Sequence, residues 1–155
     1  MQKYIFSFLL ALTIIFTTNP ANAAKFKQRN FFASLRAKET NLRTGPGMTY
    51  PIKYVYKIRS LPVKVIGEYE SWYKIEDKDD DNGWINKTLI TKKKTAIIIN
   101  GTAILFSSNN EDSHPIYRLE EDLVVRLYKC KKEWCKIKAE DRKGWVKKEG
   151  VWGNF

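Results

Sequence analysis

The sequence predicts an all-β protein in which one small barrel or sandwich module occurs twice in tandem. Apolar and polar residues alternate over short stretches rich in β-branched residues, as they do along residues 63–68. Polar turn signals separate such stretches at intervals of about 8–12 residues, which is typical of small all-β folds. The second half of the chain also repeats the order and spacing of the first half.

The chain begins with a segment typical of an export signal. A positive start that includes Lys3 precedes thirteen residues without a charge, Tyr4–Phe16, and a polar stretch that ends in Ala21–Ala23. Small residues at the end of such a stretch suit cleavage by a signal peptidase, here before Ala24. Because a membrane-spanning helix needs ~20 apolar residues, we expect residues 1–23 to be a cleaved signal peptide rather than an anchor. The mature protein would then be periplasmic or secreted, without a membrane span.

The internal repeat appears when two parts of the chain are aligned at a fixed offset. Trp72–Ile75 then matches Trp134–Ile137, and after one deletion Gly83–Ile85 matches Gly144–Val146. The agreement in order, spacing and residue type makes chance a poor explanation, so we read the chain as two diverged copies of one module.

These matches predict where the two units begin and end. We expect one unit at residues 33–91 and a second, diverged unit at residues 95–155, with a short connector over residues 91–94. Within the first unit, residues 67–71 are expected to turn a hairpin, and the polar loop 77–83 ends in an Asn-Gly turn signal.

Three motifs of the first unit carry a family resemblance. Asn41–Gly47 reads NLRTGPG, Trp72–Ile75 reads WYKI, and Gly83–Ile85 reads GWI. This ordered set resembles bacterial SH3-like (SH3b) domains, and the tandem arrangement behind a leader resembles exported SH3-like proteins of Gram-negative bacteria. The resemblance implies two SH3-like five-stranded barrels and a non-catalytic module that binds cell-wall peptides, glycan or another protein. The second unit keeps the second and third motifs and lacks the first.

Strand alternation predicts which aromatic side chains reach a ligand. If Tyr73 and Ile75 face the core, Trp72 faces outward, and the same pattern places Trp134 outward in the second unit. In SH3-like folds the Trp that begins this strand lies beside the peptide groove. Trp72 and Trp134 are therefore the candidate ligand-binding residues, with Tyr50 completing the first groove. The alternative is that these rings pack between the two units.

Other motif residues are expected to have structural roles. Asn41 and Arg43 open the first motif, and the Arg43 fork is suited to bonding loop carbonyls. Gly45 and Gly47 let the chain reverse, with positive φ where needed. Two tryptophans are expected in the core: Trp84 and Trp145.

Cys130 and Cys135 predict a disulfide across a hairpin, since an exported protein with two cysteines meets an oxidising compartment. With His114 as the only histidine, a four-ligand zinc site of nitrogen and sulfur donors cannot form. Redox motifs space their cysteines by two residues, whereas four residues separate this pair.

A calcium loop and an enzyme are both disfavoured. Asp77–Asn82 begins like an EF-hand loop, but Asn82 stands where that loop has Gly and Thr88 where it has Glu, so we expect a solvated turn. No serine or cysteine sits in a recognisable catalytic order, and no catalytic residue, metal or cofactor is predicted.

The positive charge leaves a second function open. The formal net charge is +11, which favours anionic partners such as phospholipid headgroups, lipopolysaccharide or acidic wall polymers, although a Lys-rich surface can also serve solubility alone. Nucleic acid is the least accessible of these partners to an exported protein. The alternative to a binding module is thus a structural or assembly protein that docks on an anionic envelope surface.

Overall fold

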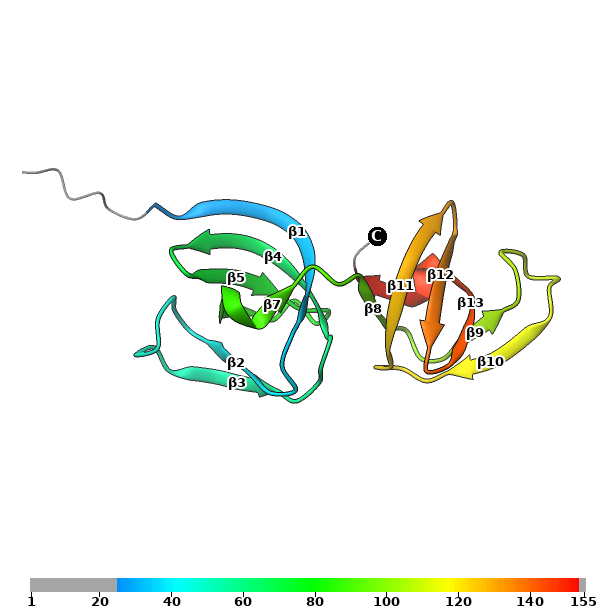
Figure 1. The fold of residues 1–155 in the computed structure, drawn as a ribbon, viewed down its shortest axis with the longest axis horizontal. Coiled ribbons are helices and arrows are strands. Elements are labelled where there is room, and N and C mark those ends of the chain that lie inside the picture. The colour runs from blue at the N-terminus through cyan, green and yellow to red at the C-terminus, as the bar shows by residue number, and fades with distance from the viewer. Residues whose placement is uncertain (1–24, 154–155) are drawn as a thin grey trace, which may run out of the picture.

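The computed structural model describes residues 25–153, and nearly all of its regular structure is β-strand. Figure 1 shows two curled antiparallel sheets, one from the blue-to-green half of the chain and one from the green-to-red half. The predicted signal peptide, residues 1–23, lies outside the described residues, as do residues 154 and 155. The helices over residues 25–153 are short 3-10 turns, and none has the length and apolarity needed to span a bilayer.

The first sheet has seven strands, in the spatial order β3-β2-β6-β5-β4-β1-β7. These strands are β1 (Lys27–Leu35), β2 (Thr40–Arg43), β3 (Ile52–Tyr56), β4 (Pro62–Tyr69), β5 (Trp72–Glu76), β6 (Asn82–Asn86) and β7 (Ile90–Thr91). The 3-10 turn η1 (Lys87–Leu89) leads into β7. It is capped by Asn86, whose side-chain oxygen accepts the backbone N–H of Thr88.

The second sheet has the same topology, β10-β9-β13-β12-β11-β8-β14. Its strands are β8 (Thr95–Ile98), β9 (Ala103–Phe106), β10 (Pro115–Leu119), β11 (Val124–Lys131), β12 (Trp134–Ala139), β13 (Arg142–Lys147) and β14 (Val151–Gly153), with η2 (Lys148–Gly150) before the last. The all-β prediction with two tandem modules is confirmed. Each sheet has seven strands rather than the expected five, because the strand that enters each module pairs with the strand that leaves it, β1 with β7 and β8 with β14.

Equivalent turns have the same unusual backbone in both sheets. Glu70 and Lys132 begin two-residue hairpin turns with φ of 46° and 52°. Ser60 and Asp122, which precede β4 and β11 by equal distances, have φ of 63° and 64°. Non-glycine residues adopt positive φ only occasionally, so these shared positions support the repeat independently of side-chain identity.

Each sheet encloses a small aliphatic core. Fully buried side chains fill the first core: Leu35, Leu42, Val63, Val65, Ile75 and Ile85. The second core has equivalent members: Ile98, Leu105, Leu119, Val125, Ile137 and Val146. The inward residues alternate with outward ones along β4, β5, β11 and β12, as the period of two requires.

The two sheets meet across a buried seam. Ile97 of β8 is 2% exposed and packs into the core of the first sheet, and Val124 and Trp152 pack against the same cluster. The Trp152 ring meets the Phe32 ring edge to face, with centroids 5.0 Å apart. The ring that fills the seam is therefore Trp152, and neither Trp72 nor Trp134 lies there, contrary to the alternative drawn from the sequence.

A buried polar contact fixes the link between the sheets. The hydroxyls of Ser34 and Thr95 are 2.6 Å apart, Ser34 donates to the carbonyl of Lys93 at 2.7 Å, and Thr95 donates to the carbonyl of Ser60 at 2.8 Å. The link itself is residues 92–94, between β7 and β8. The unit limits of 33–91 and 95–155 remain a prediction.

Candidate binding grooves

Trp72 begins β5 and lies on the face of the strand opposite Ile75, which is fully buried in the core. This is the outer face that alternation predicted. The Trp72 side chain is nevertheless only 7% exposed, because surrounding residues build a groove over it. The groove has a volume of about 290 Å³. Its other lining residues come from β2 and the residue before it, the loop after β2, the end of β6, and η1: Glu39, Asn41, Arg43, Met48, Asn86 and Leu89.

Arg43 holds the loop that forms one side of this groove. Its Nη1 donates to the carbonyl of Met48 at 3.1 Å and to the carbonyl of Tyr50 at 2.7 Å, which are the loop-carbonyl bonds predicted for the fork. The bonds fold the loop back so that Met48, which is 72% exposed, stands at the groove. Because a guanidinium has five N–H donors, the Arg43 fork has further donors to offer at the groove.

The two glycines of the opening motif serve a different purpose from the one predicted. Neither Gly45 nor Gly47 has a positive φ. The Tyr50 ring lies against both of them, so that a Cβ on Gly45 would collide with it and a Cβ on Gly47 would lie 3.2 Å from it. Glycine is needed here for the close approach of the ring. Tyr50 is 46% exposed and packs on this loop, and it does not line the groove over Trp72.

An equivalent groove lies in the second sheet. It has a volume of about 510 Å³, and its lining includes Thr102, Ile104, Phe106, Glu111, Lys147 and Gly150. β9 and β13 occupy the places of β2 and β6 in the sheet, and Phe106 pairs with Trp145 as Arg43 pairs with Trp84. The same depression therefore occurs in both modules with different side chains.

In the second groove, the side chains that stand in place of those of the first groove cover Trp134. Its side chain is 9% exposed, and the Phe106 ring packs edge to face against it with centroids 5.5 Å apart. Lys147 lies over the same ring, 5.6 Å from its centroid, and forms an ion pair with Glu111. The hydrogen bond to this carboxylate raises the pKa of Lys147. The second groove thus combines an aromatic pair with an ion pair, where the first offers amides.

The prediction that Trp84 and Trp145 lie in the core is wrong. Their neighbours Ile85 and Val146 are fully buried, so alternation turns both tryptophans outward. The glycine of the motif takes the inward position before each Trp, and at Gly83 a Cβ would lie 2.6 Å from Leu42 Cγ and 2.8 Å from a backbone oxygen. Phe26 packs against the Trp84 ring at 6.1 Å.

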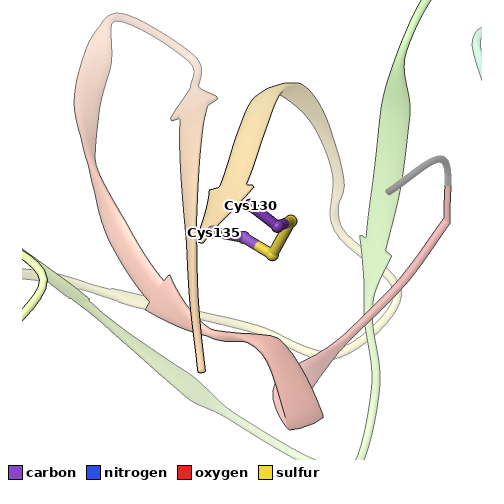
Figure 2. Close-up of a disulfide and its surroundings, with 2 residues drawn as sticks. All are labelled: Cys130 and Cys135. Carbon is purple, nitrogen blue, oxygen red and sulfur yellow. A yellow bond between two sulfur atoms is a disulfide. The ribbon is translucent and has the colours of Figure 1, made fainter. Parts of the chain in front are cut away.

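The predicted disulfide between Cys130 and Cys135 is confirmed. The two residues are directly paired across β11 and β12, with Cα atoms 4.0 Å apart, and Figure 2 shows the bond bridging this hairpin. The equivalent pair in the first sheet is Glu68 and Tyr73, which β1 holds in place. There Arg29 pairs with Glu68 at 2.6 Å, and the Phe31 ring packs on Tyr73 at 5.7 Å.

The acidic loop after β5 is organised by one carboxylate. Asp77 is 8% exposed and accepts the backbone N–H groups of Asp79 and Asp81, both at 3.0 Å. It also accepts the hydroxyl of Tyr56 at 2.7 Å, and burial followed by this bond raises the pKa of Tyr56. The Asp77 oxygens thus serve the turn itself. Over residues 25–153, no three His, Cys, Asp or Glu side chains are grouped to hold a metal ion.

The fold and the repeated groove can be compared with known proteins. The sequence profile described as bacterial SH3 domain matches the chain twice, over residues 36–92 and 100–153. The chain belongs to the bacterial SH3 domain family. Each of the two matched segments is therefore a bacterial SH3 domain, and the tandem arrangement is the one that the motifs predicted. No protein with a curated description has significant sequence similarity to the chain.

Similar solved structures are distant from this pair of bacterial SH3 domains. NlpC2 from Trichomonas vaginalis has 11% identity and a TM-score of 0.37, with 81% of this chain and 48% of that chain covered. An NlpC/P60 family protein from Bacillus cereus has 12% identity and a TM-score of 0.36, with 78% and 55% covered. A putative autolysin from Listeria monocytogenes has 10% identity and a TM-score of 0.34, with 83% and 64% covered. The chain spans about half the length of the first of these proteins.

Proposed function

We propose that the protein is a non-catalytic envelope module that binds a cell-wall peptide or glycan, or a protein partner, in the groove over Trp72. The proposal rests on this groove, which has an aromatic floor and which has an equivalent at the same place in the second sheet. The predicted signal peptide and the disulfide support a periplasmic or secreted location, where such ligands are found.

The groove has the chemistry of a binding site for a short polar chain. Trp72, Met48 and Leu89 give apolar area, while Asn41 and Glu39 present polar side chains. Among the described residues, neither the Asn41 amide nor the Glu39 carboxylate has a hydrogen-bond partner. An apolar floor with a few convergent polar groups is typical of ligand sites, and a volume near ~300 Å³ is at the small end of their range. It suits one or two peptide residues or sugar rings.

The lining offers binding groups rather than a catalytic pair. Glu39 is the one acidic residue among the lining residues, and no histidine, cysteine or serine lines the groove with it. A carboxylate without a partner base, acid or nucleophile lacks the arrangement that hydrolysis requires. The same residue can accept hydrogen bonds from a peptide amine or from sugar hydroxyls.

Retention on purified insoluble peptidoglycan tests the proposal. Asn41→Ala and Met48→Ala change groove walls that the fold does not need, and each is expected to weaken retention by about tenfold, as loss of a central contact does. Trp72→Ala should abolish it, with the thermal unfolding midpoint measured alongside because Trp72 is nearly buried. Asn109→Ala changes an exposed amide in the loop between β9 and β10; it is the matched control and should bind like the unchanged protein.

Salt concentration distinguishes this groove from a charged docking surface. Contacts with an aromatic floor and amides should weaken little between low and high salt, whereas attraction to a charged surface is screened. The proposal fails if Asn41→Ala and Met48→Ala proteins, both folded, are retained as well as the Asn109→Ala control. It also fails if retention disappears at high salt with all variants behaving alike.

A further inference from the structure

The outer face of the second sheet carries a cluster of cations that the grooves do not use. Five basic side chains on β11, β12 and β13 form what we call the cationic face: Arg126, Lys129, Lys136, Lys138 and Lys143. They are cross-strand neighbours, since Lys138 pairs with both Arg126 and Lys143, and Lys129 pairs with Lys136. Side chains directly opposite in an antiparallel pair share a face, with Cβ atoms about 5 Å apart.

Two aromatic rings lie among these cations. Two cations of the face lie over the Tyr128 ring, at 5.3 and 5.9 Å from its centroid. Two others lie over the Trp145 ring, at 6.0 and 5.8 Å from its centroid. The rings hold the long basic side chains over one surface, since cations are attracted to the face of an aromatic ring.

The positive charge of this face is nearly uncompensated. Among the described residues, the single ion pair made by the five side chains joins Lys138 to Asp141 at 3.6 Å, and Asp141 is fully exposed. Like charges directly opposite on neighbouring strands destabilise a sheet. The cationic face therefore costs stability, which indicates that its charge has a use outside the fold.

The first sheet shows that the fold does not require this arrangement. Lys64 and Glu76 stand at the positions of Arg126 and Lys138, and they form an ion pair at 3.3 Å. β1 also runs along β4 from residue 27, whereas β8 pairs with β11 only at residues 124–126. Two features are thus specific to the second sheet. A positive side chain, Lys138, stands where the first sheet has an acidic one, and within residues 25–153 most of β11 has no partner strand on the side of β8.

A cleft between the two sheets continues the cationic surface. It has a volume of about 710 Å³, and four basic residues line it: Arg59, Lys93, Lys94 and Arg126. No Asp or Glu of the described residues is among the lining. Arg126 belongs both to this cleft and to the cationic face, and the Tyr128 ring beneath it lines the cleft as well. The two surfaces therefore form one track that passes from the seam onto the second sheet.

We infer that this track binds a linear phosphodiester polymer of the cell envelope, with a polyol or sugar backbone. Arg and Lys side chains are the donors that recognise phosphate, and their close spacing on neighbouring strands suits successive phosphates of one chain. The partly exposed side chains of Tyr128 and Trp145 can pack on the backbone between the phosphates.

The shape of the track and the position of its rings favour this ligand over two others. A flat lipid surface can reach the face but not a cleft between the sheets, whereas a single chain can enter both. Single-stranded nucleic acid needs an open ring face for each stacked base. Lysine ammonium groups already lie over the Trp145 ring.

Binding of poly(glycerol phosphate) measured over a range of salt concentrations tests the inference. The triple variant Lys129→Gln, Lys136→Gln, Lys138→Gln should bind at least about tenfold more weakly at low salt, and the slope of log affinity against log salt should fall by about two, since each released phosphate contact contributes ~0.7. A triple variant with the same charge loss at three exposed lysines elsewhere is the control: Lys25→Gln, Lys27→Gln, Lys57→Gln. It should keep the affinity and slope of the unchanged protein.

Competing ligands distinguish the sources of phosphate. Phosphatidylglycerol vesicles carry glycerol phosphate groups on a surface, and an oligothymidylate of equal phosphate count carries phosphodiesters on a nucleic-acid backbone. The inference is overturned if either competes as well as the polymer, if the two triple variants lose equal affinity, or if no polymer binding is measured. Asn41→Ala should leave polymer binding unchanged, so failure of the groove proposal and failure of this inference are separable.

Discussion

The disulfide offers the most direct test of how the second sheet is stabilised. Cys130→Ala with Cys135→Ala removes a bond that closes a loop with a sequence separation of 5. The chain-entropy relation gives about 2 kcal/mol for so short a loop. Cys135 is fully buried in the core, so its truncation adds a small packing loss to the loss of the bond. The free energy of unfolding should therefore fall by somewhat more than the entropic value.

Urea unfolding of the oxidised, reduced and doubly substituted proteins separates these two contributions. Reduction leaves both sulfurs in place and removes only the bond. With a denaturant slope of about 2 kcal/mol per molar, the midpoint should fall by about 1 M on reduction and slightly further in the double variant. A fall of this size would agree with the loop-closure origin of the stabilisation.

Amide hydrogen exchange locates the effect. Loss of the bond should speed exchange in the β11–β12 hairpin and leave the β4–β5 hairpin unchanged, because β1 pairs along β4 while β8 covers only the start of β11. The reasoning is refuted if the reduced protein unfolds within about 0.2 M of the oxidised protein, an interval well below the loop-closure expectation. Equal acceleration in both hairpins would refute it as well.

Three further outcomes follow from single contacts. Burial raises the pKa of Tyr54 to about 12, and that of its neighbour Tyr56 is raised as well, both from an ordinary value of 10.0. The folded state thus keeps protons that the unfolded chain releases, so stability should be complete below pH 10 and fall as the pH rises toward 12. Tyr56→Phe should flatten that fall in urea titrations; an unchanged slope would contradict it. Gly144→Ala places a Cβ 2.5 Å from a backbone oxygen and should cost about 1–3 kcal/mol. Gly150→Ala, whose nearest neighbour atom is 3.7 Å away, should change stability by less than about 1 kcal/mol. Trp152→Ala should lower the thermal midpoint by the equivalent of about 3 kcal/mol and speed exchange in the first sheet too; an effect confined to the second sheet would argue against a shared seam.

Local sequence patterns predicted the elements and the disulfide because these depend on neighbours in the chain. The period of two placed Trp72 on the outer face, and the same period applied to Ile85 would have placed Trp84 outward. The expectation of a core Trp84 came from residue type, since large aromatics often fill small cores. The inward place beside Leu42 has no room for more than a glycine.

Sequence patterns did not predict the contacts between segments that lie far apart in the chain. Trp152 meets Phe32 across the seam, and neither residue belongs to a motif that signals this contact. The sequence predicted only part of the groove wall: its motifs indicated structural roles for Asn41 and Arg43. Their position around Trp72 depends on how the loop after β2 folds back, which the sequence alone did not indicate.

The disulfide between Cys130 and Cys135 makes the order of the cationic face depend on the redox state of the protein's surroundings. In the first sheet β1 pairs along the edge of the equivalent hairpin, while in the second a covalent bond holds the hairpin and β8 pairs only with the start of β11. Under reducing conditions, the strands that carry Lys129 and Lys136 would be held less firmly. The cationic face would thus reach its full order only once the disulfide has formed, so binding of anions to this face would be weaker in the reduced protein.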